Sequence, residues 1–200
     1  MKKIMSIILI LCSTALIAQR NWKTETSKDG KVIVKSDIVN TDDGKVIYYI
    51  AETTTDISLE KAEKCLRDSQ THKNFLENTT ESKQVEKSSE SKWITYYFFD
   101  APWPMPNSDA VQEFTVTKTP NSLTVSGTSK PKAYKSTDVK RMNNYDITYH
   151  FEKLENQKTK LTITAKFSPV GRVPKFLLKG WFPKGPAGIA TRLINEISKK

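Results

Sequence analysis

The sequence predicts an α+β protein in which helices gather on one face of a strongly curved antiparallel sheet. Apolar and polar residues alternate along several runs that are separated by short breaks, which is typical of antiparallel strands. The spacing changes after Pro169 and Gly171, and from Val173 onward apolar residues recur at helical intervals. We therefore expect the sheet to lead into one closing helix at the end of the chain.

The first half of the chain predicts a hairpin followed by two helices. Two β-rich runs, 31–39 and 45–51, are joined by a segment rich in Asn, Asp and Gly, which indicates a β-hairpin. Asp56 or Ser58 can cap a helix of about three turns, and a second short helix is expected at 71–76.

The second half returns to strand patterns, joined by breaks short enough to favour an antiparallel meander. We expect strands at 82–87, 93–99, 110–118, 122–129, 138–153 and 158–167. Alternation gives each strand one apolar face, and the inner face should be rich in aromatic residues. The register that decides which rings point inward is not fixed by the sequence; the candidates are Tyr97, Phe99, Phe114, Tyr145, Tyr149, Phe151 and Phe167.

The closing helix should carry an apolar stripe and should kink or break near 183–186, where two prolines occur. The stripe comprises Phe176, Leu177, Trp181, Ile189, Leu193 and Ile197. A sheet and one helix leave more apolar inner surface than they can fill, so an apolar ligand is expected to complete the core.

Residues 1–18 have the layout of a secretory signal peptide, with two lysines, an apolar run at 4–12 and small residues before a cleavage point near Ala18. The apolar run is short for a membrane span. Leu11 stands where a lipoprotein signal has a small residue, which argues against lipid attachment at Cys12. We therefore expect a cleaved signal peptide and an exported protein, periplasmic or secreted, with one domain over residues 20–200.

Removal of the signal peptide leaves 30 basic against 22 acidic residues, a net charge of +8. Such a balance fits a solvated surface, and it also fits transient contact with an anionic membrane surface; nucleic acid is not expected for an exported protein. Cys65 is then the single cysteine, so no intrachain disulfide can form, and we expect a buried thiol. The 37% hydrophobic content permits one ordinary core.

Catalytic and metal-binding patterns are not found in the sequence. The two histidines, His72 and His150, lie far apart and have no matching ligands nearby, so we expect no metal site and no cofactor. His72 is expected on a helix surface, and His150 at an alternating strand position. No phosphate-binding glycine loop or nucleophile elbow occurs.

Two motifs resemble the START superfamily of lipid-transfer domains. The stretch Ala-Pro-Trp-Pro-Met-Pro-Asn-Ser-Asp-Ala-Val at 101–111 is similar to that family's Pro-Trp-Pro loop and following strand. The stretch Phe-Ser-Pro-Val-Gly-Arg-Val-Pro-Lys-Phe-Leu at 167–178 resembles the segment that opens the family's last helix. The sequence departs from the family pattern at Ser108, where an arginine is frequent, and at Ser168 and Val170, where the family has an acid and a glycine.

The resemblance covers residues 22–197 and implies a helix-grip fold, in which the curved sheet wraps the long C-terminal helix around an apolar tunnel. It implies a monomeric, non-enzymatic protein that binds a lipid or another hydrophobic small molecule for transfer or sensing. We expect the cavity and its gate to be formed by Trp103, Phe114, Arg141, Tyr145, Phe167, Phe176, Leu177 and Trp181.

Two of these residues have alternative interpretations. Trp103 either packs its loop down or forms an apolar gate beside Trp181 at the tunnel mouth. Arg141 is either a strand-start arginine in water or an inward arginine paired with Asp109 or Glu113.

Two rival classes of function remain open at this stage. One is a small helix-grip enzyme, of the cyclase or hydrolase type, acting on a hydrophobic substrate, which needs a polar pair in the cavity. The other is an interaction module with a filled core, which a packed interior would indicate.

Overall fold

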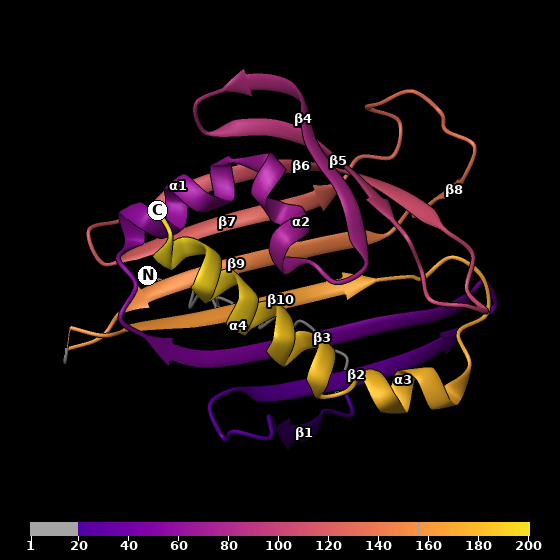
Figure 1. Cartoon of the computed structure of the whole chain (residues 1–200), viewed down its shortest axis with the longest axis horizontal. Coiled ribbons are helices and arrows are strands. Elements are labelled where there is room, and N and C mark those ends of the chain that lie inside the picture. The colour runs from indigo at the N-terminus through magenta and orange to yellow at the C-terminus, as the bar shows by residue number, and fades with distance from the viewer. Residues whose placement is uncertain (1–19, 156) are drawn as a thin grey trace, which may run out of the picture.

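A computed structural model describes residues 20–155 and 157–200, and Figure 1 shows their arrangement. The expected signal peptide, residues 1–18, lies outside the described residues. The elements are β1 (Lys23–Thr26), β2 (Ile33–Thr41), β3 (Gly44–Thr55), α1 (Leu59–Arg67), a 3-10 turn η1 (Ser69–Thr71), α2 (His72–Phe75), β4 (Thr79–Ser89), β5 (Lys92–Phe99), β6 (Ser108–Lys118), β7 (Ser122–Ser129), β8 (Lys140–Arg141), β9 (Tyr145–Lys153), β10 (Thr159–Phe167), α3 (Lys175–Trp181) and α4 (Lys184–Ser198). This is the predicted α+β class.

The ten strands of the described residues form one sheet in the order β1-β2-β3-β10-β9-β7-β6-β5-β4, with the short β8 beside β6. Neighbours along that order are antiparallel, and β8 runs parallel to β6. The strands of the second half form the expected meander, β4-β5-β6-β7-β9-β10, with only β8 off this path. The sheet then continues into the first half, because β10 pairs with β3, so that Ile47 lies opposite Phe167 and Thr55 opposite Thr159. The helices after β3 carry the chain to the far edge of the sheet, where β4 begins (Figure 1).

Helix α4 lies across one face of the sheet, as the apolar stripe predicts (Figure 1). Leu193 and Ile197 are fully buried in the same core as alternate residues of β9 and β10. Because one face of each strand is covered and the other is not, the side chains alternate between buried and half-buried along β9. The inward residues of the two strands are Tyr145, Ile147, Tyr149, Phe151, Leu161, Ile163 and Ala165.

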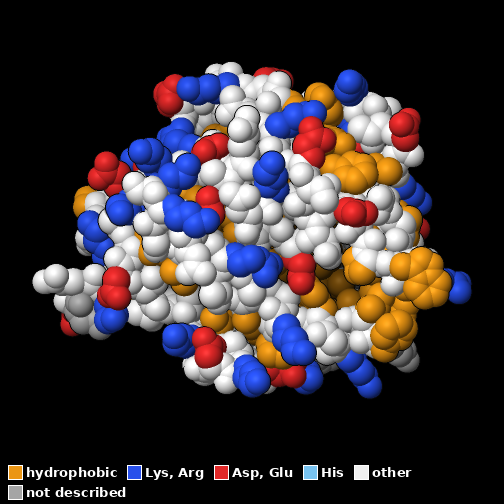
Figure 2. Space-filling model, viewed as in Figure 1, with side chains coloured by type: hydrophobic (Ala, Val, Ile, Leu, Met, Phe, Trp, Pro, Cys, Tyr) orange, Lys and Arg blue, Asp and Glu red, His pale blue; other side chains and the backbone are white. Residues whose placement is uncertain are grey.

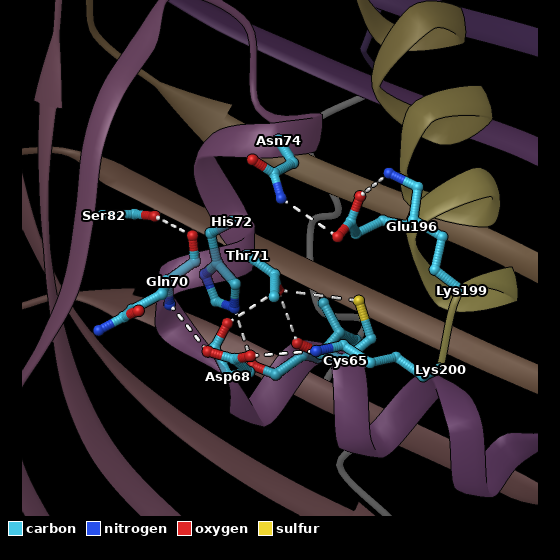
Figure 3. Close-up of polar contacts among 11 residues, drawn as sticks. Cys65, Asp68, Gln70, Thr71, His72, Asn74, Ser82, Glu196, Lys199 and Lys200 are labelled. Carbon is cyan, nitrogen blue, oxygen red and sulfur yellow. Dashed lines mark hydrogen bonds and ion pairs between the residues drawn. The ribbon is translucent and has the colours of Figure 1, made fainter.

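The C-terminal end of α4 is attached to α1 and α2 by polar contacts (Figure 3). Glu196 accepts a hydrogen bond from Asn74 Nδ2 at 3.1 Å and pairs with Lys199 at 2.7 Å. Lys200 pairs with Asp68 at 3.1 Å, just after α1. These contacts fix one end of α4 and leave its other end, next to α3, without comparable ion pairs among the described residues.

His72, expected on a helix surface, is fully buried, so that expectation is wrong. Its Nε2 donates to the Leu66 carbonyl at 2.8 Å, and its Nδ1 is 2.6 Å from the Tyr97 hydroxyl. A carbonyl can only accept, so Nε2 carries a proton. The lowered pKa keeps the ring neutral, and in the neutral ring Nδ1 accepts from the Tyr97 hydroxyl. Burial lowers the His72 pKa to about 4, partly offset by the Leu66 carbonyl and Asp68. A four-residue helix enclosed on several sides leaves no periodic signal in the sequence.

Two further expectations need correction, and a third is confirmed. The strand expected at 138–153 is broken into β8 and β9, because the chain turns away after Arg141 before it rejoins the sheet at Tyr145. The closing helix breaks at Phe182 and Pro183, as the prolines predict, and forms two helices. Phe176, placed on the buried stripe, is instead 67% exposed, because α3 buries Leu178.

Candidate hydrophobic ligand site

Aromatic side chains cluster where β10 ends, β9 begins and α3 meets the sheet. Phe167 contacts Tyr49, Tyr145 and Trp181 edge-on, with ring centroids 6.5, 6.0 and 5.8 Å apart. Trp181 in turn contacts Tyr49 at 5.8 Å and Phe182 at 4.7 Å. Edge-to-face packing of this kind is favourable for aromatic pairs. The cluster forms an apolar wall at one end of the concave face.

A hollow opens beside this wall. Figure 2 shows hydrophobic side chains around it at the right-hand end of the molecule, where Figure 1 places the end of β10, α3 and the β5–β6 connection. Two large apolar side chains belong to these segments and remain exposed, Trp103 at 90% and Phe176 at 67%. Trp103 therefore does not pack its loop against the core.

The β5–β6 connection that carries Trp103 is held by its own hydrogen bonds and by the segment after β10. Asn107 Oδ1 accepts from the Ala101 amide at 3.0 Å. Gly171, at a left-handed φ of +79°, lies so close to Pro106 that an added Cβ would be 3.3 Å from the proline ring. The two segments that resemble the START motifs thus meet at the rim of the hollow.

Trp181 is held by contacts on both sides of its indole. Its Nε1 donates to Glu77 Oε2 at 2.5 Å, which connects α3 to the turn after α2. Gly185 leaves room for the ring, since a Cβ there would be 2.0 Å from Trp181 Nε1. Leu177, one helical turn before Trp181, is half-buried and packs on the core. These contacts position α3 over the aromatic wall.

Arg141 lies on the other face of the sheet and does not point toward α4. It binds Asp109 through Nε–Oδ1 at 2.9 Å and Nη2–Oδ2 at 2.8 Å, and donates to three backbone carbonyls of residues 131–135. Asp109 alternates along β6 with the inward Ala110, and its neighbour Val111 belongs to a separate outer cluster. Asp109, one of the two expected candidates, is thus the partner of Arg141. The interpretation in which the Arg141 side chain points inward is wrong. The pair instead orders the 131–141 loop.

Phe114 is fully buried, but it lies away from the rim. Its ring stacks on Trp93 at 5.4 Å and meets His72 edge-on at 5.4 Å, near α1 and α2. The structure therefore brings together Tyr145, Phe167, Leu177 and Trp181, with Trp103 and Phe176 at the rim, and places Phe114 and Arg141 elsewhere. The sequence patterns did not identify Tyr49, Phe182 or Glu77 as parts of this site. For Tyr49, the alternation of Ile47, Tyr49 and Ala51 was the one signal available.

Two pockets of defined volume lie elsewhere on the molecule. One, of about 520 Å³, is at the opposite ends of β9 and β10, with polar and charged lining that includes Asp56, Asn121 and Lys153. The other, of about 180 Å³, lies beside Arg67 and Trp93. Neither lies between the sheet and α4, where the aromatic side chains pack on one another. This packing agrees with the alternative of an interaction module with a filled core, and a ligand between the sheet and α4 has to displace some of those side chains.

No cluster of metal-ligating side chains occurs among residues 20–155 and 157–200. Within the same ranges, none of the helices has the length and apolar character needed to cross a bilayer.

No protein-family model matches the sequence, and no curated protein matches it. Solved structures match its fold. A STAR-related lipid transfer protein from Xanthomonas axonopodis (residues 25–204) has a TM-score of 0.74 at 20% identity, over 88% of this chain and 98% of that one. Human StAR-related lipid transfer protein 5 has a TM-score of 0.69 at 16% identity, over 89% and 86% of the two chains. The Zhui aromatase/cyclase from Streptomyces has a TM-score of 0.55 at 8% identity, over 77% and 94%.

These matches show a likeness of fold to START and StAR-related lipid transfer domains, a bacterial one among them. The chain has a START-like fold, with an antiparallel sheet packed against a long C-terminal helix, as the sequence motifs led us to expect.

Proposed function

We propose that this chain binds a lipid or another hydrophobic small molecule between the concave face of the sheet and its C-terminal helices, and transfers or senses it. The observation that carries the proposal is the hollow lined by hydrophobic side chains at the end of β10. The neighbouring β5–β6 connection and α3 carry the exposed Trp103 and Phe176. Large exposed aromatic side chains are unusual on a monomer and mark interaction sites when they gather. The START-like fold supports the same conclusion.

Entry is proposed at α3. The opposite end of α4 is held by the Glu196 and Lys200 contacts, whereas α3 is a seven-residue helix without a side-chain N-cap. Separating α3 from the sheet breaks the Trp181–Glu77 hydrogen bond and exposes the aromatic wall to a ligand.

The enzyme alternative requires an acid–base pair of side chains in the interior, and the pair found there does not support it. His72 and Tyr97 are the inward acid–base pair, but both ring nitrogens of His72 already have partners. A general base has to lie within hydrogen-bond reach of the substrate proton, and His72 is enclosed by Leu66, Tyr97 and Phe114. We therefore propose a binding protein without catalytic activity.

Two further parts of the proposal concern where the protein works. The signal layout of residues 1–18 supports export, so the mass of the mature protein should correspond to a start near residue 19 or 20; retention of Met1 would contradict export.

Arg172 and Lys179 are exposed near Phe176, which supports transient contact with anionic membranes by a monomer. Vesicles with anionic lipid should retain more protein than neutral vesicles.

The experiment that tests binding compares Trp103→Ala with Trp22→Ala. Both remove an exposed indole, but Trp22 precedes the edge strand β1, outside the rim. Trp103→Ala should change the exchange rate or affinity of a fluorescent fatty acyl probe, while its stability stays within about 0.5 kcal/mol of wild type. Trp22→Ala should change neither. A loss of stability in Trp103→Ala with unchanged binding per folded molecule would show a structural loop.

A further inference from the structure

Four tyrosines on the inner face of the sheet are almost completely buried, and the hydroxyl of one of them, Tyr149, is buried without a hydrogen-bond partner. Tyr97 donates to His72. Among the described residues none bonds the hydroxyls of Tyr49 and Tyr145. Most buried polar groups in native proteins are paired, so the unpaired Tyr149 hydroxyl, on the same face as Tyr49 and Tyr145, calls for an explanation.

The strand register places the three tyrosines around one small residue. Ala165 of β10 lies between Tyr49 of β3 and Ile147 of β9. Tyr145 and Tyr149 stand two residues to either side of Ile147 on the same face. Because Ala165 has the shortest side chain there, the three rings surround a low point of the inner face.

The hydroxyls also influence one another electrostatically. Burial raises the pKa of Tyr149 well above its usual value, and Tyr145, Tyr97 and Tyr49 raise it further. Burial likewise raises the pKa of Tyr49, with Tyr145 adding to it. Because these pKa values are raised, the hydroxyls remain protonated, so that each can donate and accept a hydrogen bond.

We propose that Tyr49, Tyr145 and Tyr149 form a polar subsite that binds an uncharged hydroxyl or carbonyl group on the hydrophobic ligand. This rests on the proposed function. The subsite lies next to the aromatic wall, since Tyr49 and Tyr145 both contact Phe167. A ligand that enters at α3 thus meets apolar rings first and places its polar group above Ala165. Neutral hydroxyls favour an uncharged group, because a buried charge requires a counter-charge.

The test uses Tyr→Phe variants, which keep the ring and remove one oxygen. Dodecanol and dodecane compete against a fluorescent fatty acyl probe on wild type, Tyr149→Phe, and a variant with all three substitutions. Wild type should prefer dodecanol, and each lost hydroxyl should reduce that preference roughly three- to tenfold. Tyr48→Phe is the matched control, because Tyr48 is next to Tyr49 but points to the other face, beneath Arg20.

Stability distinguishes this role from a structural one. Tyr149→Phe removes a buried hydroxyl without a partner, so its melting temperature should equal or exceed that of wild type. A lower melting temperature with unchanged preference would overturn the proposal. Equal binding of dodecanol and dodecane would also overturn the proposed subsite. If the fluorescent probe still binds in that case, the proposed function remains intact. Tighter binding of dodecanoate than of dodecanol would show that a charge is recognised instead. If the probe itself does not bind, the proposed function fails as well.

Discussion

The buried His72 makes folding stability depend on pH in a way that can be calculated. Its pKa is about 4 in the folded protein, against 6.5 for an exposed histidine. Between these values the unfolded chain binds more protons than the folded one, so stability is complete above pH 6.5 and is lost as pH falls toward 4. Each unit of pKa difference corresponds to 1.36 kcal/mol, so the loss between pH 7.5 and 4 is about 3 kcal/mol.

The assay is urea unfolding, followed by circular dichroism at pH 7.5, 6, 5 and 4, on wild type and His72→Gln. Glutamine stays uncharged, and the carboxylates that also titrate at low pH are common to both proteins and cancel in the difference. The stability advantage of wild type should shrink by about 3 kcal/mol on going from pH 7.5 to 4. A difference between wild type and His72→Gln that does not change with pH would refute the burial of a neutral histidine.

Two further substitutions test how the C-terminal helices are held. Leu193→Asp places a carboxylate in the core and should cost at least about 3 kcal/mol, whereas Asn195→Asp on the exposed side of α4 should change stability by less than about 0.5 kcal/mol in chemical denaturation. Gly185→Ala should displace the Trp181 indole, lower the free energy of unfolding by about 1 to 3 kcal/mol and shift the tryptophan emission. The control Gly180→Ala has open space around the added methyl group, so it should be neutral or stabilising. Equal stabilities within either pair would contradict the packing described.

Local patterns predicted most of the elements. The strands at 110–118 and 122–129 were expected from alternation, and β6 and β7 correspond to them closely, since one covered face forces a two-residue period. The pairing of β3 with β10 joins segments about a hundred residues apart, and no local pattern specifies such a contact. The burial of His72 depends on elements from other parts of the chain in the same way.

The candidate site could be predicted only in part. Phe167 was identified from the alternation along its strand, and Trp181 from the helical spacing of the apolar stripe. Arg141 was assigned to the wrong face, because the chain leaves the sheet between β8 and β9 and the alternation of β9 does not extend back to it. Tyr49 was missed, since its role depends on which strand lies beside β3.

The central claim is that a hydrophobic molecule occupies the space between the sheet and the C-terminal helices. Native mass spectrometry of the protein purified from its own host tests this most directly, because it needs no assumption about the ligand. The account predicts one co-purifying hydrophobic molecule per chain, released on denaturation and reduced in amount by Trp103→Ala or Gly185→Ala. A protein that carries only its polypeptide mass, and binds no fluorescent fatty acyl probe when offered one, would contradict it.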